Sequence, residues 1–378
     1  MTIGFNKPHL TGREVEFIME AVASEKISGD GMFTKKCQAW FEKKYGFNKT
    51  LLTTSCTDAL EMAAILADIK DGDEVIAPSY AFVSTVNAFV LRGAKIVFAD
   101  SCADNPNIDA GQLEGLITPR TKMIVPIHYA GIACDMDKVM QVAKANNLLV
   151  VEDAAHAIDS FYKGKPLGSI GHLAAFSFHE TKNIISGEGG MLVVNADKFA
   201  LRAEIIREKG TNRSAFFRGE VDKYSWVDIG SSFLPSDILA AFLYAQLLNL
   251  EDIQRRRIHT WNLYHENLKY LSEATGIQLP VIPAYATNNA HNYTIVCRSL
   301  EERTGLIDHL KSRGIQAVFH YLSLHRSPYF HRTNAFIPIL KNSDRFSDCL
   351  VRLPMYYDLQ DDQVNSICQA VESFYKKA

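Results

Sequence analysis

The sequence predicts an α/β fold in which a mostly parallel sheet is packed between helices. The first observation is the alternation of short apolar runs with amphipathic stretches between about residues 49 and 195. Runs of this kind, separated by helices, are typical of parallel strands buried on both faces. The second observation is size, because 378 residues with 47% hydrophobic content can bury a large core. This length favours one large domain with a smaller partner.

The expected elements follow the chain in order. The apolar runs that we expect to form strands of the large domain are residues 49–52, 73–78, 95–99, 122–127, 148–151 and 191–194, with helices between them. A long polar-faced helix over residues 251–271 leads into a second unit with expected strands 292–297 and 315–319 and helices 303–312 and 362–375. This second pattern indicates a small α+β domain. We therefore expect a large domain over residues 1–250 and a small C-terminal domain over residues 251–378.

A carboxylate and a lysine are the main candidates for chemistry. Asp153 ends the apolar run Leu149-Val-Val-Glu-Asp153, and Lys182 closes the segment Ser177-Phe-His-Glu-Thr-Lys182. Pyridoxal 5'-phosphate (PLP) needs both groups: a buried carboxylate keeps its pyridine nitrogen protonated, and a lysine holds its aldehyde as a Schiff base. Taken singly, an Asp at the end of an apolar strand is most often a helix cap or turn residue, and Lys182 alone would be a surface lysine. Together they predict catalytic roles.

A hydroxyl-rich turn supplies a candidate phosphate site. Ser55, Cys56 and Thr57 open an apolar helix directly after the first expected strand, and Ser177 lies five residues before Lys182. Free N–H groups and the positive dipole end of a helix suit a phosphate dianion, although such a turn is also typical of a plain helix cap. Cys56 has no convincing His or Asn partner for a nucleophilic role. The glycines of residues 185–191 predict a tight turn behind Lys182.

Composition limits the remaining function classes. The formal net charge is -3 and Lys and Arg are scattered along the chain, so we expect no nucleic-acid partner. The seven cysteines are odd in number without close paired spacing. With no recognisable signal peptide, this predicts a reducing cytoplasm and no disulfide framework. No apolar run approaches the roughly 20 residues of a membrane span. We expect neither a membrane segment nor a metal site.

Several motifs together resemble a known family. They are Thr54-Ser-Cys-Thr57, Pro78-Ser-Tyr-Ala-Phe82-Val-Ser-Thr85, His128-Tyr-Ala-Gly131, Glu152-Asp-Ala-Ala-His156, Ser177 to Asn183 and Gly187-Glu-Gly-Gly190. In this order the chain resembles, over nearly its whole length, the PLP-dependent nucleotide-sugar aminotransferases of the DegT/DnrJ/StrS type. The resemblance implies PLP-dependent transferase fold type I, with a mostly parallel seven-stranded sheet and a small C-terminal α+β domain. It also implies a homodimer with its active sites at the subunit interface.

Other segments resemble one branch of that family, which makes dTDP-4-amino-4,6-dideoxygalactose. They are residues 29–31, 207–213, 217–219, 222–224 and 317–321. The resemblance implies ping-pong transfer of an amino group from L-glutamate to C4 of dTDP-4-dehydro-6-deoxy-D-glucose, with 2-oxoglutarate as the second product. The aminosugar would serve a cell-surface polysaccharide such as lipopolysaccharide O-antigen or enterobacterial common antigen.

The resemblance also assigns roles to individual residues. It implies that Lys182 forms the Schiff base and moves protons, and that Asp153 faces the pyridine nitrogen. The other cofactor contacts that the resemblance implies are Ser55, Cys56, Thr57 and Ser177 at the phosphate and Phe82 on the ring face. His156, where many relatives have Gln, is a further cofactor contact that it implies. Without the resemblance, a Phe in an amphipathic helical stretch favours a core position for Phe82. The substrate candidates are Lys209, Arg213, Arg218, Tyr224 and His320, for which surface ion pairs or a structural histidine are equally good interpretations.

One position departs from the family pattern, and some alternatives stay open. Many relatives supply an Asn from the partner subunit to the cofactor phosphate, whereas this chain has Leu234; Ser231, Ser232 or a backbone N–H are possible replacements. The sugar 3-dehydratase branch carries His at the Schiff-base position, so Lys182 disfavours it. Amination at C3, a 4-amino gluco product, or a catalytically idle PLP-binding regulatory protein remain alternatives.

Overall fold

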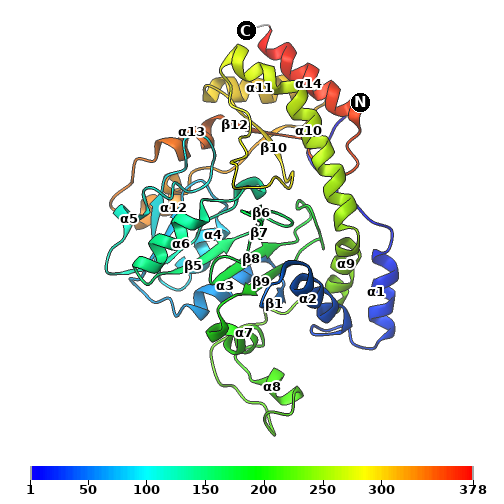
Figure 1. The fold of residues 1–378 in the computed structure, drawn as a ribbon, viewed down its shortest axis with the longest axis vertical. Helices are drawn as coiled ribbons and strands as arrows, with labels where there is room; N and C mark the ends of the chain where they lie inside the picture. Colours follow the sequence, from blue (N-terminus) through cyan, green and yellow to red (C-terminus); the bar gives the residue numbers. More distant parts are fainter. Residues whose placement is uncertain (1, 377–378) are drawn as a thin grey trace.

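The computed structural model describes residues 2–376 and shows a seven-stranded sheet packed between helices, with a smaller domain above it (Figure 1). The strands of the large sheet are β1 (Lys49–Thr53), β2 (Glu74–Pro78), β3 (Lys95–Ala99), β4 (Thr121–Ile124), β5 (Leu149–Asp153), β8 (Leu173–Ser177) and β9 (Gly190–Val194). A two-stranded hairpin, β6 (Phe161–Tyr162) with β7 (Lys165–Pro166), lies beside it. The strands predicted from the apolar runs therefore all exist, with ends shifted by a few residues.

The sheet is mostly parallel, as predicted. Its strand order is β1-β9-β8-β5-β4-β2-β3. Only β9 runs against the direction of the other six strands, and it pairs with β1 on one side and β8 on the other. The remaining pairs are parallel, so the carboxyl ends of β2, β4, β5 and β8 meet at one edge of the sheet. Ligands of such sheets bind outside this edge.

Both faces of the sheet are buried, because successive side chains of each strand point to opposite sides. Leu52, Val150 and Val193 contribute to one apolar cluster, and their neighbours Leu51, Val151 and Val194 contribute to the other. The first cluster is covered by α1 (Glu14–Ala23), α2 (Met32–Tyr45), α5 (Leu113–Leu116), α6 (Met136–Ala145) and α9 (Asp237–Leu248). The second is covered by α3 (Cys56–Leu66), α4 (Ser84–Val90) and α7 (Ala200–Arg207).

The N-terminal helices were not predicted, and a long-range cap explains how one of them begins. The buried carboxylate of Asp237, at the start of α9, accepts hydrogen bonds from the backbone N–H groups of Phe33 and Thr34 at the start of α2. Gly31 makes this approach possible, since a Cβ there would lie 2.4 Å from the Asp237 carboxylate. A cap that comes from 200 residues away leaves no local sequence signal.

The C-terminal part forms a separate α+β core. Its antiparallel sheet has the order β10 (Tyr293–Val296), β12 (Leu350–Leu353), β11 (Val318–Phe319). The central strand β12 was not predicted. The helices of this part are α10 (Leu250–Thr275), α11 (Leu300–Ser312), α12 (Pro328–Thr333), α13 (Lys341–Cys349) and α14 (Asp361–Tyr375). Ile3 pairs with Ile315 and joins this core. The division at residue 250 stays a prediction.

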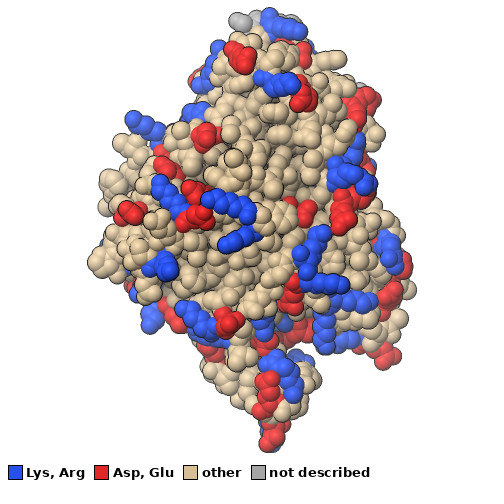
Figure 2. Space-filling view, in the orientation of Figure 1, with Lys and Arg blue, Asp and Glu red and all other residues tan. Residues whose placement is uncertain are grey.

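A long excursion leaves the large domain between α7 and α9. We call residues 209–231 the arm; it contains the short helix α8 (Arg213–Phe217) and is closed by a bridge between Glu208 and Ser232. Figure 1 shows the arm extending away from the sheet, and Figure 2 shows charges of both signs side by side on it. Phe217 and Trp226 are exposed. Among residues 2–376, no helix has the length and hydropathy needed to cross a bilayer.

Candidate active site

A cavity of about 520 Å³ opens at the carboxyl edge of the sheet, between the large domain and the C-terminal part. It brings together sequence candidates that lie far apart in the chain. They are Ser55, Cys56, Thr57, Phe82, Asp153, His156, Ser177, Lys182 and His320. Strand β1 ends just before Ser55, β5 ends at Asp153 and β8 ends at Ser177. This agrees with the position expected for a ligand on a parallel sheet.

Asp153 is buried at the end of β5 and is held by two hydrogen bonds. Its carboxylate accepts the hydroxyl of Thr85 at 2.7 Å and the backbone N–H of Ala155 at 3.1 Å. Burial raises the pKa of Asp153 above its ordinary value, while these two donors oppose the rise. The Asp153 carboxylate thus stabilises the turn after β5 through Ala155 and also lines the cavity. A cationic ring nitrogen in the cavity would favour the charged form of Asp153 and so oppose the effect of burial.

Lys182 lies in the loop after β8 and faces the same cavity. Burial lowers its pKa to about 8, so about one tenth of the amine is neutral at pH 7. The glycine turn behind it also forms: Gly187 and Gly189 have φ values of 82° and 158°. At Gly190 a Cβ would lie 2.3–2.4 Å from the backbone of Ser55 and Cys56. A glycine here therefore lets β9 approach the start of α3.

The hydroxyl-rich turn forms the start of α3 at the cavity wall. Ser55 is the N-cap, and its Oγ accepts the N–H of Asp58 at 3.0 Å. Thr57 Oγ1 donates to Ser84 Oγ at 2.8 Å. The cap interpretation is confirmed, and it does not exclude a phosphate site, because capping uses one N–H and the turn still lines the cavity. Burial raises the pKa of Cys56 well above its usual value, which disfavours a nucleophilic thiolate.

Three histidines form another wall of the cavity. His156 stacks on His291 with ring centroids 4.0 Å apart, and His320 contacts the hydroxyl of Tyr129 through Nδ1 at 2.6 Å. Burial lowers the pKa of each imidazole well below its usual value, so all three are neutral. His156 Nδ1 accepts the N–H of Ala130, which places its proton on Nε2, facing the Tyr321 hydroxyl at 3.3 Å. The nitrogens of His156 thus engage these groups rather than the Asp153 carboxylate.

The core interpretation of Phe82 is wrong. Phe82 lies in the loop before α4, not inside a helix, and its side chain is 56% exposed. It lines the cavity with its ring centroid 6.0 Å from that of Tyr321. An apolar ring that faces a cavity instead of a core is available to stack on a flat ligand.

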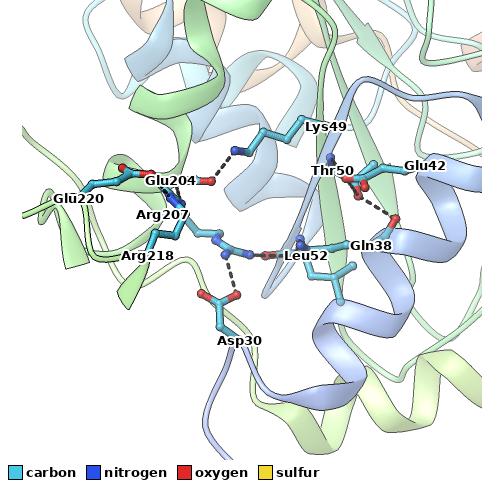
Figure 3. Close-up of polar contacts among 10 residues, drawn as sticks. All are labelled: Asp30, Gln38, Glu42, Lys49, Thr50, Leu52, Glu204, Arg207, Arg218 and Glu220. Atoms are coloured by element: carbon cyan, nitrogen blue, oxygen red, sulfur yellow. Dashed lines mark hydrogen bonds and ion pairs between the residues drawn. The ribbon is translucent and has the colours of Figure 1, made fainter. Parts of the chain in front are cut away.

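The basic substrate candidates do not line the cavity that contains Lys182. Lys209, Arg213 and Arg218 line a second and larger cavity of about 1220 Å³, between the arm, α2 and β1. Arg218 pairs with Glu204 and Glu220, as Figure 3 shows, and Arg213 lies over the ring of Phe217. Tyr224 is exposed on the same arm. Within one chain these residues do not reach the cavity of Lys182, and their contacts match the alternative of surface pairing.

Arg207 anchors the base of the arm beside this second cavity. Arg207 is buried, and its guanidinium donates to Asp30 at 2.6 Å, to Gln38 and to the carbonyl of Leu52 (Figure 3). These contacts tie α7 to the segment that precedes α2. Leu234, the departure from the family pattern, also lies here, packed so close to Gly29 that a Cβ there would meet it at 2.2 Å.

Some cavity residues were not identified from the sequence. Thr85 orients Asp153, His291 stacks on His156, and Phe5, Tyr321 and Arg352 complete the wall. Phe5 and Arg352 reach the cavity from the N-terminal segment and from β12, both of which the sequence analysis left unassigned. Thr85 and Tyr321 fall within the segments 78–85 and 317–321, although no role was assigned to them, and no local motif marks His291, Phe5 or Arg352.

The groups around the cavity fit PLP on three separate grounds. A buried carboxylate with a raised pKa suits a protonated ring nitrogen, a lysine with a lowered pKa suits an aldehyde, and the start of α3 with Ser177 suits a phosphate. Phe82 adds a flat apolar surface. Among the described residues, no cluster of His, Cys, Asp and Glu could hold a metal ion.

Comparison with known proteins gives consistent matches over the whole chain. The model of the DegT/DnrJ/EryC1/StrS aminotransferase family matches residues 8–372. The chain is 31% identical to GDP-perosamine synthase of Escherichia coli O157:H7 over 98% of its length and 97% of that protein. It is also 31% identical to the spore coat polysaccharide biosynthesis protein SpsC of Bacillus subtilis, over 99% and 97% of the two chains.

Solved structures agree with these sequence matches. Spr1654 of Streptococcus pneumoniae in its pyridoxamine phosphate (PMP) form superposes with a TM-score of 0.92, at 27% identity over 99% of both chains. Its PLP form gives a TM-score of 0.91, over 100% of this chain and 99% of that one. The fold and the site thus define a PLP-dependent transferase of fold type I. The chain belongs to the DegT/DnrJ/EryC1/StrS aminotransferase family, so it is a PLP-dependent aminotransferase of nucleotide sugars.

Proposed function

We propose that this protein transfers the amino group of L-glutamate to C4 of dTDP-4-dehydro-6-deoxy-D-glucose, by a ping-pong mechanism. The products are dTDP-4-amino-4,6-dideoxy-D-galactose and 2-oxoglutarate, and the reaction takes place in the cytoplasm. The observation that carries the proposal is that Asp153, Lys182 and the start of α3 line one cavity at the edge of this fold. The branch and the donor rest on the sequence resemblance of residues 29–31, 207–213 and 317–321.

Lys182 performs the proton transfers in this proposal. PLP, when bound, supplies an electron sink that stabilises negative charge at the carbon next to the amino group. Lys182 would hold the cofactor aldehyde in the resting enzyme. When free, its amine would take up the proton that leaves Cα of the donor. A pKa of about 8 leaves enough neutral amine for this base role near neutral pH.

Asp153 keeps the ring nitrogen protonated. Thr85 and the N–H of Ala155 fix its carboxylate, so the group cannot turn away from the ring when the cavity fills. The positive charge of the ring nitrogen and the negative charge of Asp153 stabilise each other in a site with little water. Phe82 holds the ring plane, and Ser55, Cys56, Thr57 and Ser177 hold the phosphate. His156, which lines the same cavity, would contact the cofactor.

We place Lys209, Arg213, Arg218, Tyr224 and His320 around the nucleotide sugar, in a homodimer with active sites at the subunit interface. The arm extends from the body and exposes Phe217, Tyr224 and Trp226, which are large side chains typical of an interface. An arm that does not reach its own cavity can supply its cations to the cavity of a second copy. Ser231 and Ser232, at the base of the arm, would then replace the phosphate contact that Leu234 cannot make.

Mixing two inactive variants tests this arrangement. Co-expressed Lys182→Ala and Arg213→Ala chains should recover activity, because each mixed dimer contains one site with an intact lysine and an intact arm. With random pairing of subunits, about one quarter of all sites are restored. The purified mixed dimer, separated by two different tags, is compared with each parent for amino transfer. Failure of the mixed dimer to exceed its parents would show that each site is built within one chain.

A nucleotide panel tests the substrate assignment. The dTDP-, UDP- and GDP-linked 4-dehydro-6-deoxysugars are compared as amino acceptors with glutamate as donor. We expect kcat/KM for the dTDP sugar to exceed that for the others by about 10-fold or more, since contacts to the base act on the transition state as well as on binding. Higher kcat/KM for the GDP sugar would overturn the branch assignment while leaving the aminotransferase class intact.

A further inference from the structure

A buried hydrogen bond joins two segments that both carry residues of the active-site cavity. Ser79 follows β2 and lies three residues before Phe82. His325 lies four residues after Tyr321, in the C-terminal part of the chain. The Oγ of Ser79 and the Nδ1 of His325 are 2.7 Å apart. Ser79 is 0% exposed and His325 is 2% exposed, so water does not compete for this bond.

A carboxylate on the other side of the imidazole sets the place of its proton. The Oδ1 of Asp344, on α13, lies 3.5 Å from the Nε2 of His325, and Arg326 balances its charge from 3.6 Å. Burial lowers the pKa of His325, so the ring is neutral and carries one proton. A carboxylate accepts but does not donate, so this proton lies on Nε2 and Nδ1 accepts the hydroxyl of Ser79. We call Ser79, His325 and Asp344 the clasp.

The clasp has the residue types of a hydrolytic Ser-His-Asp triad, but its burial excludes that chemistry. A nucleophilic serine must reach a substrate, whereas Ser79 is fully buried. Its other polar groups are engaged as well: its N–H donates to the carbonyl of Ala99, and its carbonyl accepts the N–H of Leu324. Its Oγ also accepts the backbone N–H of His325 at 3.2 Å. The clasp therefore holds the two segments together and does not cleave bonds.

The segments that the clasp joins form one wall of the active-site cavity. Phe82 and Tyr321 line the cavity, with ring centroids 6.0 Å apart. The buried ring of Tyr80 packs against Tyr321 at 5.7 Å. Ring packing tolerates a range of distances and angles, whereas a hydrogen bond fixes both within narrow limits. The clasp therefore sets where Phe82 stands relative to Tyr321.

We propose that His325 is a positioning residue of the active site: its hydrogen bond with Ser79 fixes two parts of the cavity wall against each other. These parts are the loop that carries Phe82 and the segment that carries Tyr321. The inference rests on the ring contact proposed above for Phe82. A wall that is fixed before the cofactor binds does not have to be ordered on binding, so the clasp raises cofactor affinity. Because the cofactor serves both half-reactions, the clasp supports both to a similar extent.

Two substitutions of His325 separate its bond to Ser79 from the space that its ring fills. The side-chain amide of Asn reaches the position of Nδ1, and that of Gln reaches the position of Nε2 beside Asp344. We expect His325→Gln to raise the Kd of PLP, measured by dilution of the holoenzyme, about 5- to 10-fold, and His325→Asn to stay within about 2-fold of wild type. The circular dichroism of the bound cofactor at about 410–430 nm should weaken in His325→Gln and persist in His325→Asn.

Ser79→Ala removes the same hydrogen bond from the other side and should match His325→Gln. Because both substitutions act on one bond, the double variant should be no worse than either single variant. His309→Gln is the matched control, since the Nε2 of His309 lies 3.0 Å from the Oγ of Ser373, between α11 and α14. Neither His309 nor Ser373 lines the cavity. The control should keep the wild-type affinity for PLP.

Several results would overturn the inference. They are wild-type PLP affinity in both His325→Gln and Ser79→Ala, additive losses in the double variant, and equal losses in His325→Asn and His325→Gln. Loss of only one half-reaction in single turnovers would do the same. Phe82→Ala tests the ring contact separately: wild-type PLP affinity there would refute the contact proposed for Phe82. Weaker PLP binding in His325→Gln and Ser79→Ala would still support the clasp in that case, through Tyr321.

Discussion

Replacing Lys182 by Ala should abolish amino transfer while leaving the fold intact. The substitution removes the group that binds the aldehyde and the base that moves the proton, so we expect a loss of at least about 10³-fold in kcat. The absorbance band of the lysine-bound cofactor, at about 410–430 nm, should disappear as well. Burial disfavours the charged amine in the native state, so its removal should not lower the thermal midpoint. Absorbance and calorimetry measure these effects.

Lys163→Ala is the matched control for this variant. Lys163 is exposed and pairs with Asp137 on the surface, and such pairs contribute little to stability. The control should keep wild-type absorbance and activity. Reduction with borohydride followed by peptide mapping then identifies the lysine that carries the cofactor. A reduced adduct on any lysine other than Lys182 would rule out the assignment.

Replacing Asp153 by Asn should leave PLP bound but slow its chemistry. The amide keeps an acceptor for Thr85 or Ala155, and the phosphate and lysine contacts are unchanged. A neutral amide no longer holds the ring nitrogen protonated, so we expect kcat to fall on the order of 100-fold, or about 2.7 kcal/mol in the barrier. Cofactor content by absorbance and kcat by coupled assay separate binding from catalysis.

The isosteric control is Asp137→Asn on the surface. It removes a carboxylate of the same size from an exposed pair and should leave kcat unchanged. Wild-type turnover in Asp153→Asn would show that this carboxylate has no part in the mechanism. Loss of bound cofactor in Asp153→Asn, without a change in the phosphate contacts, would instead make the carboxylate a binding group.

The large domain was predictable from local patterns because each strand is buried on both faces. Residues 149–153, for example, begin with the apolar run Leu149-Val-Val151, which is typical of a strand buried on both faces. The terminal Asp153 falls at the edge of the sheet where ligands bind. Lys182 and the start of α3 also follow strands of this sheet, so their positions near the same edge could be predicted. These candidates could be placed together because parallel topology brings strand ends to one edge.

Features that depend on long-range contacts could not be predicted. The strand β12 is short and carries the charged Arg352 at its centre, so its sequence does not resemble a buried strand. The start of α2 relies on Asp237, about 200 residues away. Phe82 has the residue type of a core position, yet it lies in a loop at the cavity. The arm carries cations whose role depends on a second copy of the chain, which a single sequence does not describe.

The most direct test of the account follows the donor nitrogen. The PLP enzyme is mixed with L-glutamate that is isotopically labelled in its amino group, freed of excess glutamate, and then given dTDP-4-dehydro-6-deoxyglucose. Nuclear magnetic resonance of the sugar product should show the labelled nitrogen at C4 in the galacto configuration. Label at C3, label at C4 in the gluco configuration, or an unlabelled and unchanged sugar after conversion of the cofactor would contradict the proposed reaction.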